Sequence, residues 1–458
     1  MKYDSKYLCD TLGIDPGGVE SIEEAQTDSG PVYHITLAAR AARCPACGGT
    51  RCKSKGHTVR RLSHSLFVDR DATFIVRQKR MKCADCERTF VLQSELSRPR
   101  GRVSRATERL ILSELMDPSA TFKSVARRAR TTPTTVMNVF DRYCSAPRKA
   151  LPRILCIDEC YGKGQFNEPY CLVLLDFETK KVVDVLEGRD SARFSKYLSS
   201  IPESERASVD FVCIDMWEPY LAAAERWLPN AIVCVDSFHV MENLVRAVDR
   251  VRCRVMRGWA GGSDEHYLLK KFDHLIYSTR VSPWGKKIKV DRFHGWRSAY
   301  ELREQLLRID PQLRIAFDFY HSYQRFNSSD LTPEYAAKRL DELRKDATAA
   351  SVPELASFQS TLAHWREWIA NSFVRVNGRR ISNGPIEGTN NQLKKVMRVA
   401  DGVTSFPRFR ARIMYVCNKE ISMSPSKSTK GTGKKRGKYK KGTQKMPEPH
   451  RDSGSSPH

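Results

Sequence analysis

Two acidic residues follow neighbouring apolar runs between residues 211 and 240. Asp215 comes directly after the run 211–214, and Asp236 follows the run 231–235, with His239 three residues later. The segment reads as strand, helix, strand. Reacting groups in α/β sheets lie beyond the carboxyl ends of strands, so both acids are candidates for a functional site.

Two further carboxylates belong to the same pattern. Asp158 follows the apolar run 154–157, and Glu387 lies near the start of a helix predicted from the turn at Asn383-Gly384-Pro385. A single acid after a strand is most often a turn residue or a helix cap. Three converging carboxylates instead favour Mg²⁺ or Mn²⁺, and two such ions about 4 Å apart support phosphoryl transfer. We therefore expect Asp158, Asp215 and Glu387 to hold two ions.

Glu159, Asp236 and His239 leave alternatives within this site. Neighbours along a strand point to opposite faces, so Asp158 and Glu159 cannot share one site, and we choose Asp158. The order of strands and acids favours Asp215 over Asp236 for the second carboxylate. His239 is either a catalytic residue, which orients a phosphate or a metal ligand or acts near the leaving group, or an ordinary structural histidine.

Four cysteines near the N-terminus have the spacing of a zinc site. Cys44 with Cys47, and Cys83 with Cys86, form two CxxC pairs separated by β-prone sequence. Two such knuckles complete a tetrahedral Zn²⁺ site, and four filled positions indicate a structural ion. The alternative is a set of buried or redox-active thiols. A hairpin or small sheet must fold between the two pairs.

Two short amphipathic helices follow, which predicts a helix-turn-helix. The first spans 121–129, and Thr132-Pro133 then supplies an N-cap and a first-turn proline for the second. Side chains that point away from the shared core are candidates for DNA contacts. They are Arg127 and Arg128 for phosphates, and Thr134, Thr135 and Asn138 for base edges. The alternative is an ordinary helical linker with a basic face.

From residue 153 onward the patterns predict the order β-β-β-α-β-α-β-α, a mixed sheet with helices. Residues 242–370 read as mostly helical, with Trp296, Trp365 and Trp368 expected in their core. Residues 424–458 are rich in Lys, Gly, Ser and Thr, which predicts a disordered basic tail.

The charge of the whole chain indicates a polyanionic partner. The 458 residues include 78 Lys and Arg against 53 Asp and Glu, a net charge of +25. Nucleic acid is the commonest polyanion for such a protein, and a solvated basic surface is the alternative. No secretory signal or membrane span is visible, and cysteines scattered through apolar strands indicate the cytoplasm. We expect no membrane partner.

Together these motifs resemble bacterial DDE transposases with an RNase H-like catalytic domain, and in particular the ISL-three family of insertion-sequence transposases. The resemblance rests on the paired CxxC motifs and on the segments 157–159, 213–216, 235–240 and 382–402. It implies an Asp-Asp-Glu triad at Asp158, Asp215 and Glu387 and an Asp-x-x-His element at Asp236 and His239. It also implies an all-helical insertion before the glutamate, and terminal inverted repeats recognised by the N-terminal region.

The expected organisation follows from the motifs and the resemblance. We expect a zinc-ribbon-like domain at 1–100 and a helix-turn-helix at 101–148. An RNase H-like α/β catalytic domain is expected in two pieces, 149–241 and 371–423. A helical insertion at 242–370 separates these pieces, and a tail follows at 424–458. Asn383, Asn390 and Asn391 either support Glu387 or contact DNA, and helix capping is the alternative for Asn383. Lys394 is a further candidate for a DNA contact. The expected partner is double-stranded DNA, at both the transposon ends and the target, bound by at least a dimer.

Two other functions remain open from the sequence. A non-catalytic DNA-binding regulator would use the zinc and helix-turn-helix regions alone. The intact Asp-Asp-Glu triad argues against this alternative. An RNase H-type nuclease would share the acidic site but has no need for DNA-reading modules at the N-terminus.

Overall fold

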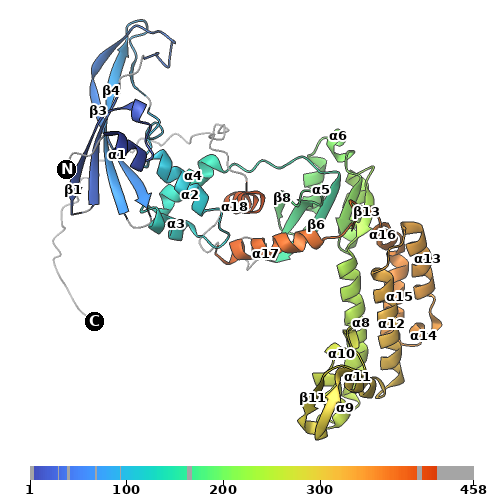
Figure 1. Cartoon of the computed structure of the whole chain (residues 1–458). Helices are drawn as coiled ribbons and strands as arrows, with labels where there is room; N and C mark the ends of the chain where they lie inside the picture. The colour runs from blue at the N-terminus through green and yellow to red at the C-terminus, as the bar shows by residue number, and fades with distance from the viewer. Residues whose placement is uncertain are drawn as a thin grey trace, which may run out of the picture.

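The computed structural model describes residues 5–28, 30–38, 42–67, 70–92, 94–161, 168–399 and 405–419. Figure 1 shows an elongated molecule with one sheet near the N-terminus, a second sheet in the middle and a helical arm at the far end. The tail predicted to be disordered, 424–458, lies outside the described residues. Within the described ranges, no helix is long and apolar enough to cross a bilayer.

The N-terminal sheet is built around one long hairpin, as the spacing of the cysteine pairs requires. Its strands are β1 (Val19–Thr27), β2 (Gly30–Leu37), β3 (Cys52–Phe67), β4 (Arg70–Cys83) and β5 (Thr89–Val91). They pair in the order β1-β2-β4-β3, and β5 pairs with β4. One face is buried through Leu62, Phe74 and Val76, which share a core with α1 (Ser5–Thr11). A short turn, η1 (Pro16–Gly18), links α1 to β1.

Three helices follow this sheet, and the predicted pair with a tight turn is confirmed. They are α2 (Arg105–Glu114), α3 (Phe122–Arg128) and α4 (Pro133–Tyr143). Thr121 and Thr132 cap α3 and α4, each accepting a backbone N–H three residues ahead. The helices bury a common core that includes Val125, Val139 and Phe140.

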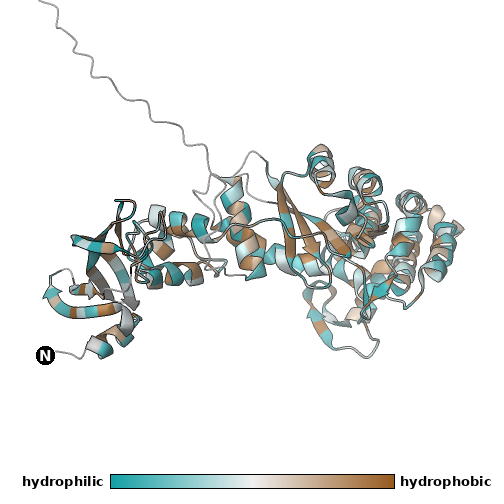
Figure 2. Ribbon diagram, turned by 90° about the horizontal axis from the view of Figure 1, so that it is seen from above, coloured by the Kyte–Doolittle hydropathy of each residue, from teal (hydrophilic) through white to brown (hydrophobic). Residues whose placement is uncertain are grey.

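The middle sheet confirms the predicted mixed α/β arrangement. Its strands are β6 (Ile154–Tyr161), β7 (Tyr170–Asp176), β8 (Val182–Glu187), β9 (Phe211–Ile214) and β10 (Ile232–Val235). Their order is β10-β9-β6-β7-β8, in which β6, β9 and β10 are parallel and β7 is antiparallel to both of its neighbours. The strands are brown between more mixed helices in Figure 2, as expected for a sheet covered on both faces.

Each face of this sheet has its own helices, because alternate strand residues point to opposite sides. Leu155 and Ile157 pack on the face covered by α5 (Ser191–Ser199) and α7 (Glu218–Trp227). The opposite face carries α17 (Gly384–Arg398) and α18 (Phe406–Asn418). A single turn of helix, α6 (Glu203–Arg206), precedes β9.

The helical arm lies between β10 and α17. Its helices are α8 (Ser237–Arg257), α9 (Asp264–Lys271), α10 (His274–Tyr277), α11 (Ala299–Leu307), α12 (Pro311–Asn327), α13 (Pro333–Arg344), α14 (Ala347–Ala350), α15 (Pro353–His364) and α16 (Arg366–Asn371). The helix α8 runs without a break through residues 241 and 242, where we placed a boundary. A two-residue hairpin, β13 (Arg375–Val376) with β14 (Arg379–Arg380), returns the chain to α17.

The prediction of an entirely helical arm is wrong at one place. The strands β11 (Lys287–Val290) and β12 (Gly295–Ser298) pair as an antiparallel hairpin around the turn η2 (Asp291–Phe293). Lys-Ile-Lys-Val alternates with the period of a strand, and His294 adopts the left-handed conformation that closes the turn. The tryptophans expected in the core of the arm also differ in burial: Trp365 is buried, but Trp296 on β12 is exposed.

Candidate active site

Two carboxylates meet where β6 and β9 separate. The parallel pairing of β6 with β9 covers only Ile154–Cys156, and Asp158 lies just beyond it on β6, which continues to Tyr161. Asp215 directly follows the last residue of β9. The two side chains therefore emerge from adjacent parallel strands at the same edge of the sheet.

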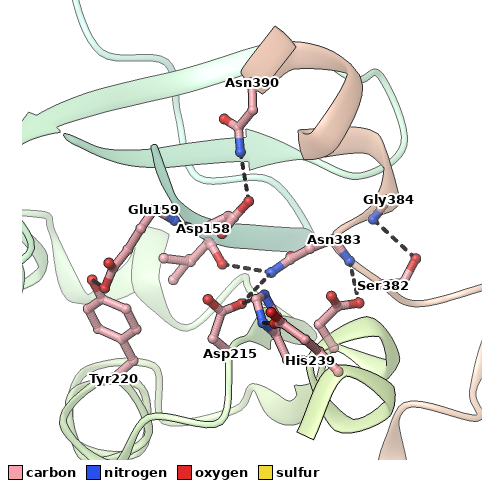
Figure 3. Close-up of polar contacts among 12 residues, drawn as sticks. Asp158, Glu159, Asp215, Tyr220, His239, Ser382, Asn383, Gly384 and Asn390 are labelled. Carbon is pink, nitrogen blue, oxygen red and sulfur yellow. Dashed lines mark hydrogen bonds and ion pairs between the residues drawn. The ribbon is translucent and has the colours of Figure 1, made fainter. Parts of the chain in front are cut away.

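His239 completes this group. It lies in the first turn of α8, and its Nε2 is 2.8 Å from Oδ1 of Asp215. One ligand atom from each of Asp158, Asp215 and His239 lies within 4.8 Å of the others, an arrangement that could hold a metal ion. Figure 3 shows the side chains converging from two strands and one helix.

Glu159 faces away from the group, as expected from strand alternation. Its Oε1 accepts a hydrogen bond from the Tyr220 hydroxyl at 2.9 Å, and its Oε2 lies 3.4 Å from Arg189. Tyr220 belongs to α7, on the sheet face opposite to α17. The choice of Asp158 over Glu159 therefore agrees with the geometry.

Asp236 does not form the pair with His239 that the Asp-x-x-His spacing suggested. It is buried before the first turn of α8, and its Oδ1 accepts the backbone N–H of Asn383 at 3.1 Å. His239 instead bonds to Asp215, which directly follows the neighbouring strand β9. Asp236 thus joins α8 to the start of α17.

The helix α17 contributes two asparagine amides to the carboxylates. Asn390 Nδ2 donates to Asp158 Oδ2 at 2.7 Å, and Asn383 Nδ2 donates to the Ile157 carbonyl at 2.9 Å and to Asp215 Oδ1 at 3.3 Å. Asn383 and Asn390 are only 2% and 8% exposed. Their amide oxygens are buried without a hydrogen-bond partner among the described residues. Such unsatisfied oxygens beside carboxylates fit a cation or its bound water.

Glu387 is not part of the cluster of ligand atoms. It is an exposed residue in the first turn of α17. It follows Asn383 by four residues and precedes Asn390 by three, so it lies on the helix face that carries both amides. The structure therefore brings together Asp158, Asp215 and His239, and leaves the carboxylate of Glu387 outside this group.

The surroundings shift the charge states of the central groups. Burial, and then the nearby charge of Asp215, raise the pKa of Asp158 to about 7. Burial lowers the pKa of His239, but its hydrogen bond to Asp215 and the charges of the three aspartates outweigh this and raise the pKa to about 9. At neutral pH the imidazolium is therefore a counter-ion and hydrogen-bond donor for Asp215. The pKa of Asp236 is raised by burial.

The raised pKa of Asp158 predicts pH-dependent metal binding. A cation must displace the proton that the metal-free carboxyl retains below about pH 7. We expect the affinity for Mn²⁺ to rise nearly tenfold from about pH 5.5 to 6.5 and to gain little more from this group above about pH 7.5. Calorimetric titration of the full chain at several pH values tests this. An affinity that is flat between pH 5.5 and 6.5 contradicts it.

The four predicted zinc ligands also come together. Sγ atoms of Cys44 and Cys86 are 3.5 Å apart, those of Cys47 and Cys83 are 3.6 Å apart, and all four fit one metal site. Four thiolates around Zn²⁺ at about 2.3 Å would lie about 3.8 Å apart. Backbone N–H groups of Ala46 and Cys47 lower the pKa of Cys44 to about 7, which favours its thiolate. The cysteine set therefore fits a structural Zn²⁺.

The predicted DNA-contacting residues differ in their exposure and in whether their side chains already bond to another residue. Thr134 and Asn138 are exposed on α4, whereas the Thr135 hydroxyl lies 2.9 Å from that of Thr132 at the cap. Arg127 is exposed, and Arg128 pairs with Glu114 at 2.8 Å. On α17, Asn391 and Lys394 are exposed. Asn390 is instead buried against Asp158, so its amide is not available on the outer surface.

Comparison with known proteins decides the family. A family model described as a transposase matches residues 155–413, more than half of the chain, and the helix-turn-helix domain of transposase family ISL3 matches residues 93–144. The chain belongs to the ISL3 family of transposases.

Curated relatives agree with this ISL3 assignment at low identity. The transposase for insertion sequence element IS1001 of Bordetella parapertussis is 24% identical over 86% of this chain and 94% of its own length. The transposase for IS1557 of Mycobacterium tuberculosis, in strains CDC 1551 and H37Rv, is 22% identical over 55% of this chain. That match spans 57% of the relative's length.

For this ISL3-family chain, the sequence indicated Asn383 and Asn390 as supports for Glu387 or as DNA contacts, but not that their amides bond to Asp215 and Asp158. Asn383 occupies the N-cap position of α17, but its side chain makes no capping hydrogen bond and reaches Asp215 instead. The signal that could have found it is the seven-residue spacing from Asn383 to Asn390, which places both on one helix face with Glu387. Nothing in the sequence pointed to Tyr220 as the partner of Glu159.

Proposed function

We propose that this chain is an insertion-sequence transposase that binds terminal inverted repeats and catalyses metal-dependent cleavage and strand transfer of DNA. The observation that carries the proposal is the convergence of Asp158, Asp215 and His239 at one edge of the sheet in a chain of net charge +25. Partly buried acids repel DNA phosphates, so such a cluster in a basic protein needs a cation to bind DNA productively. The ISL3 family membership supports the same activity.

We propose an RNase H-like fold for the catalytic part, formed by residues 149–241 and 371–423, with a zinc-ribbon-like region and a helix-turn-helix before it. The strand order β10-β9-β6-β7-β8, with one antiparallel strand at β7, supports this. The arm at 242–370 is then an insertion between β10 and α17. Its first helix begins at the site itself, because His239 lies on α8.

At the site, each residue has a distinct proposed role. Asp158 and Asp215, joined by Glu387, hold the divalent cations, and Asn383 and Asn390 fix the carboxylates in place by amide donation. His239 balances the charge of Asp215 as an imidazolium. Mg²⁺ or Mn²⁺ bound there would supply the positive charge that stabilises both the attacking and the leaving oxygen of an in-line displacement. The chain supplies no covalent nucleophile in this scheme, only position and charge.

The direct test uses the full chain with a labelled duplex of the transposon end and Mg²⁺ or Mn²⁺. We expect a nick that leaves a 3′-hydroxyl at the end of the element, followed by joining of that end to a second duplex. Specific binding of the end duplex with no cleavage under any divalent cation would favour the regulator instead. Two ends must be held for transposition, so we also propose at least a dimer in the DNA complex.

The helix-turn-helix makes a separate prediction about sequence recognition. Thr134 and Asn138 are exposed on α4 and contribute nothing to the helix caps, so changing both to Ala should leave the melting temperature unchanged. We expect the double variant to bind the end duplex about 10- to 100-fold more weakly, from the loss of base contacts worth about 1–3 kcal/mol. Fluorescence anisotropy with end and scrambled duplexes measures this.

Arg127→Ala provides the matched comparison for that experiment. A phosphate contact carries no sequence information, so this variant should weaken binding to both duplexes by a similar factor. If Thr134→Ala with Asn138→Ala also weakened both duplexes equally, α4 would not be the element that reads the end sequence.

A further inference from the structure

The hairpin of β11 and β12 and the turn before it carry the two most exposed tryptophans among the described residues. Trp284, just before β11, is 93% exposed, and Trp296 on β12 is 61% exposed. Exposed indoles are costly because each leaves a large apolar area in water. Two such side chains within twelve positions of the chain mark the hairpin and the turn before it as a contact surface.

The register of the hairpin places Lys287, Lys289 and Trp296 on one face. Lys289 is directly opposite Trp296, and Lys287 is opposite Ser298, so these side chains share one face. The side chains of Lys287 and Lys289 are 58% and 66% exposed. Val290 points to the other face and is buried, which holds the hairpin on the arm. This face therefore presents the Trp296 ring beside two ammonium groups.

The charge around this face is strongly positive. Residues 280–298 contain six Lys and Arg residues and a single acid, Asp291. Lys287 and Lys289 make only long contacts, at 3.8 Å to Glu301 and 3.7 Å to Asp291. Exposed pairs of this kind contribute little and are readily exchanged for a phosphate.

From this surface we propose a second DNA-binding element, which rests on the proposed function and extends it. Lys287 and Lys289 contact phosphates, while Trp284 and Trp296 stack on the bases of an unpaired stretch of DNA. Lysines alone would be sufficient for a paired duplex, whose base faces are covered by their neighbours. Exposed indoles add binding free energy only where base faces are free to stack on them. Each base stacked on an aromatic ring contributes about 1–3 kcal/mol.

The hairpin lies far from the candidate active site. The helix α8 carries His239 in its first turn and has 21 residues, a length of about 31 Å at about 1.5 Å per residue. Figure 1 shows β11 beside the far end of α8, away from the middle sheet. The hairpin therefore contacts DNA far from the reacting phosphate and should affect binding but not the chemical step.

The test compares the full chain with its Trp284→Ala/Trp296→Ala variant on a 20-nucleotide oligothymidine and on a 20-base-pair duplex, both without metal. We expect the variant to bind the single strand about 10- to 100-fold more weakly and the duplex with little change. Lys287→Ala/Lys289→Ala should reduce the slope of log affinity against log salt on the single strand by about 1.4. Cleavage of saturating end duplex should proceed at the wild-type rate in both variants.

A matched control lies on the same arm. Tyr335 is an exposed aromatic with Lys338 placed 5.3 Å over its ring on α13, so Tyr335→Ala/Lys338→Ala removes similar groups elsewhere. We expect this control to bind both probes as wild type does. Unchanged single-strand affinity in the tryptophan variant, a loss confined to the duplex, or an equal loss in the control overturns the inference. Absence of cleavage by the wild-type chain would count against the proposed function alone, since the binding assay needs no metal.

Discussion

Replacement of Asp158 by asparagine is expected to lower the rate of end cleavage about a thousandfold or more while binding of the end duplex is unchanged. Asparagine keeps the shape of the side chain but removes the negative charge that a cation needs, and losses of this kind cost about 10²–10³ or more in rate. Asp158 lies beside Asp215 in the cluster, on β6 and not on α4, the helix proposed to read the end duplex. Single-turnover cleavage and anisotropy on the same protein measure the two effects.

The adjacent Glu159 is the matched control for that result. It lies on the same strand but bonds to Tyr220 on the opposite face, so Glu159→Gln should retain cleavage within a few-fold of wild type. Asp215→Asn should resemble Asp158→Asn, and it also removes the charge that raises the pKa of His239. Wild-type strand transfer by either aspartate variant would refute the assignment of the site.

The second large effect concerns the cysteine cluster. Cys83→Ser should abolish binding of one equivalent of Zn²⁺ and lower the affinity for the end duplex about 100-fold or more. Structural zinc contributes folding free energy directly, so its loss should unfold the end of the sheet where Cys52 pairs with Cys83. The same strand supports the helix-turn-helix, because the Ser65 hydroxyl donates to the Ala129 carbonyl at 2.9 Å. Metal analysis, thermal unfolding and anisotropy measure the three consequences.

Cys52→Ser separates zinc binding from a general effect of losing a thiol. Cys52 lies next to the cluster, but its Sγ points to the Gly49 carbonyl at 3.6 Å and is not among the four ligands. This variant should keep its zinc, its melting temperature within a few degrees and its DNA affinity. Full zinc content in Cys83→Ser, or its loss in Cys52→Ser, would show that a different set of residues binds the ion.

Local features of the sequence determined the elements and the choice between neighbouring acids. Apolar runs predicted the strands of the middle sheet, and Thr132-Pro133 predicted the start of α4, since caps and strand alternation depend on residues only a few positions apart. The same alternation separated Asp158 from Glu159. The spacing of the cysteines was enough to predict that a hairpin must join the two knuckles.

Contacts between distant segments were decided only by the tertiary structure. Asn390 reaches Asp158 across 232 positions, and Asn383 reaches Asp215 across 168, contacts that depend on how α17 packs on the sheet. His239 bonds to Asp215 and not to Asp236, a contact that depends on how α8 packs against the sheet. The sequence by itself determined which residue types lie at the carboxyl ends of the strands. Only packing decided which of them touch, because the rotation of a helix on a sheet is set by all of its buried side chains together.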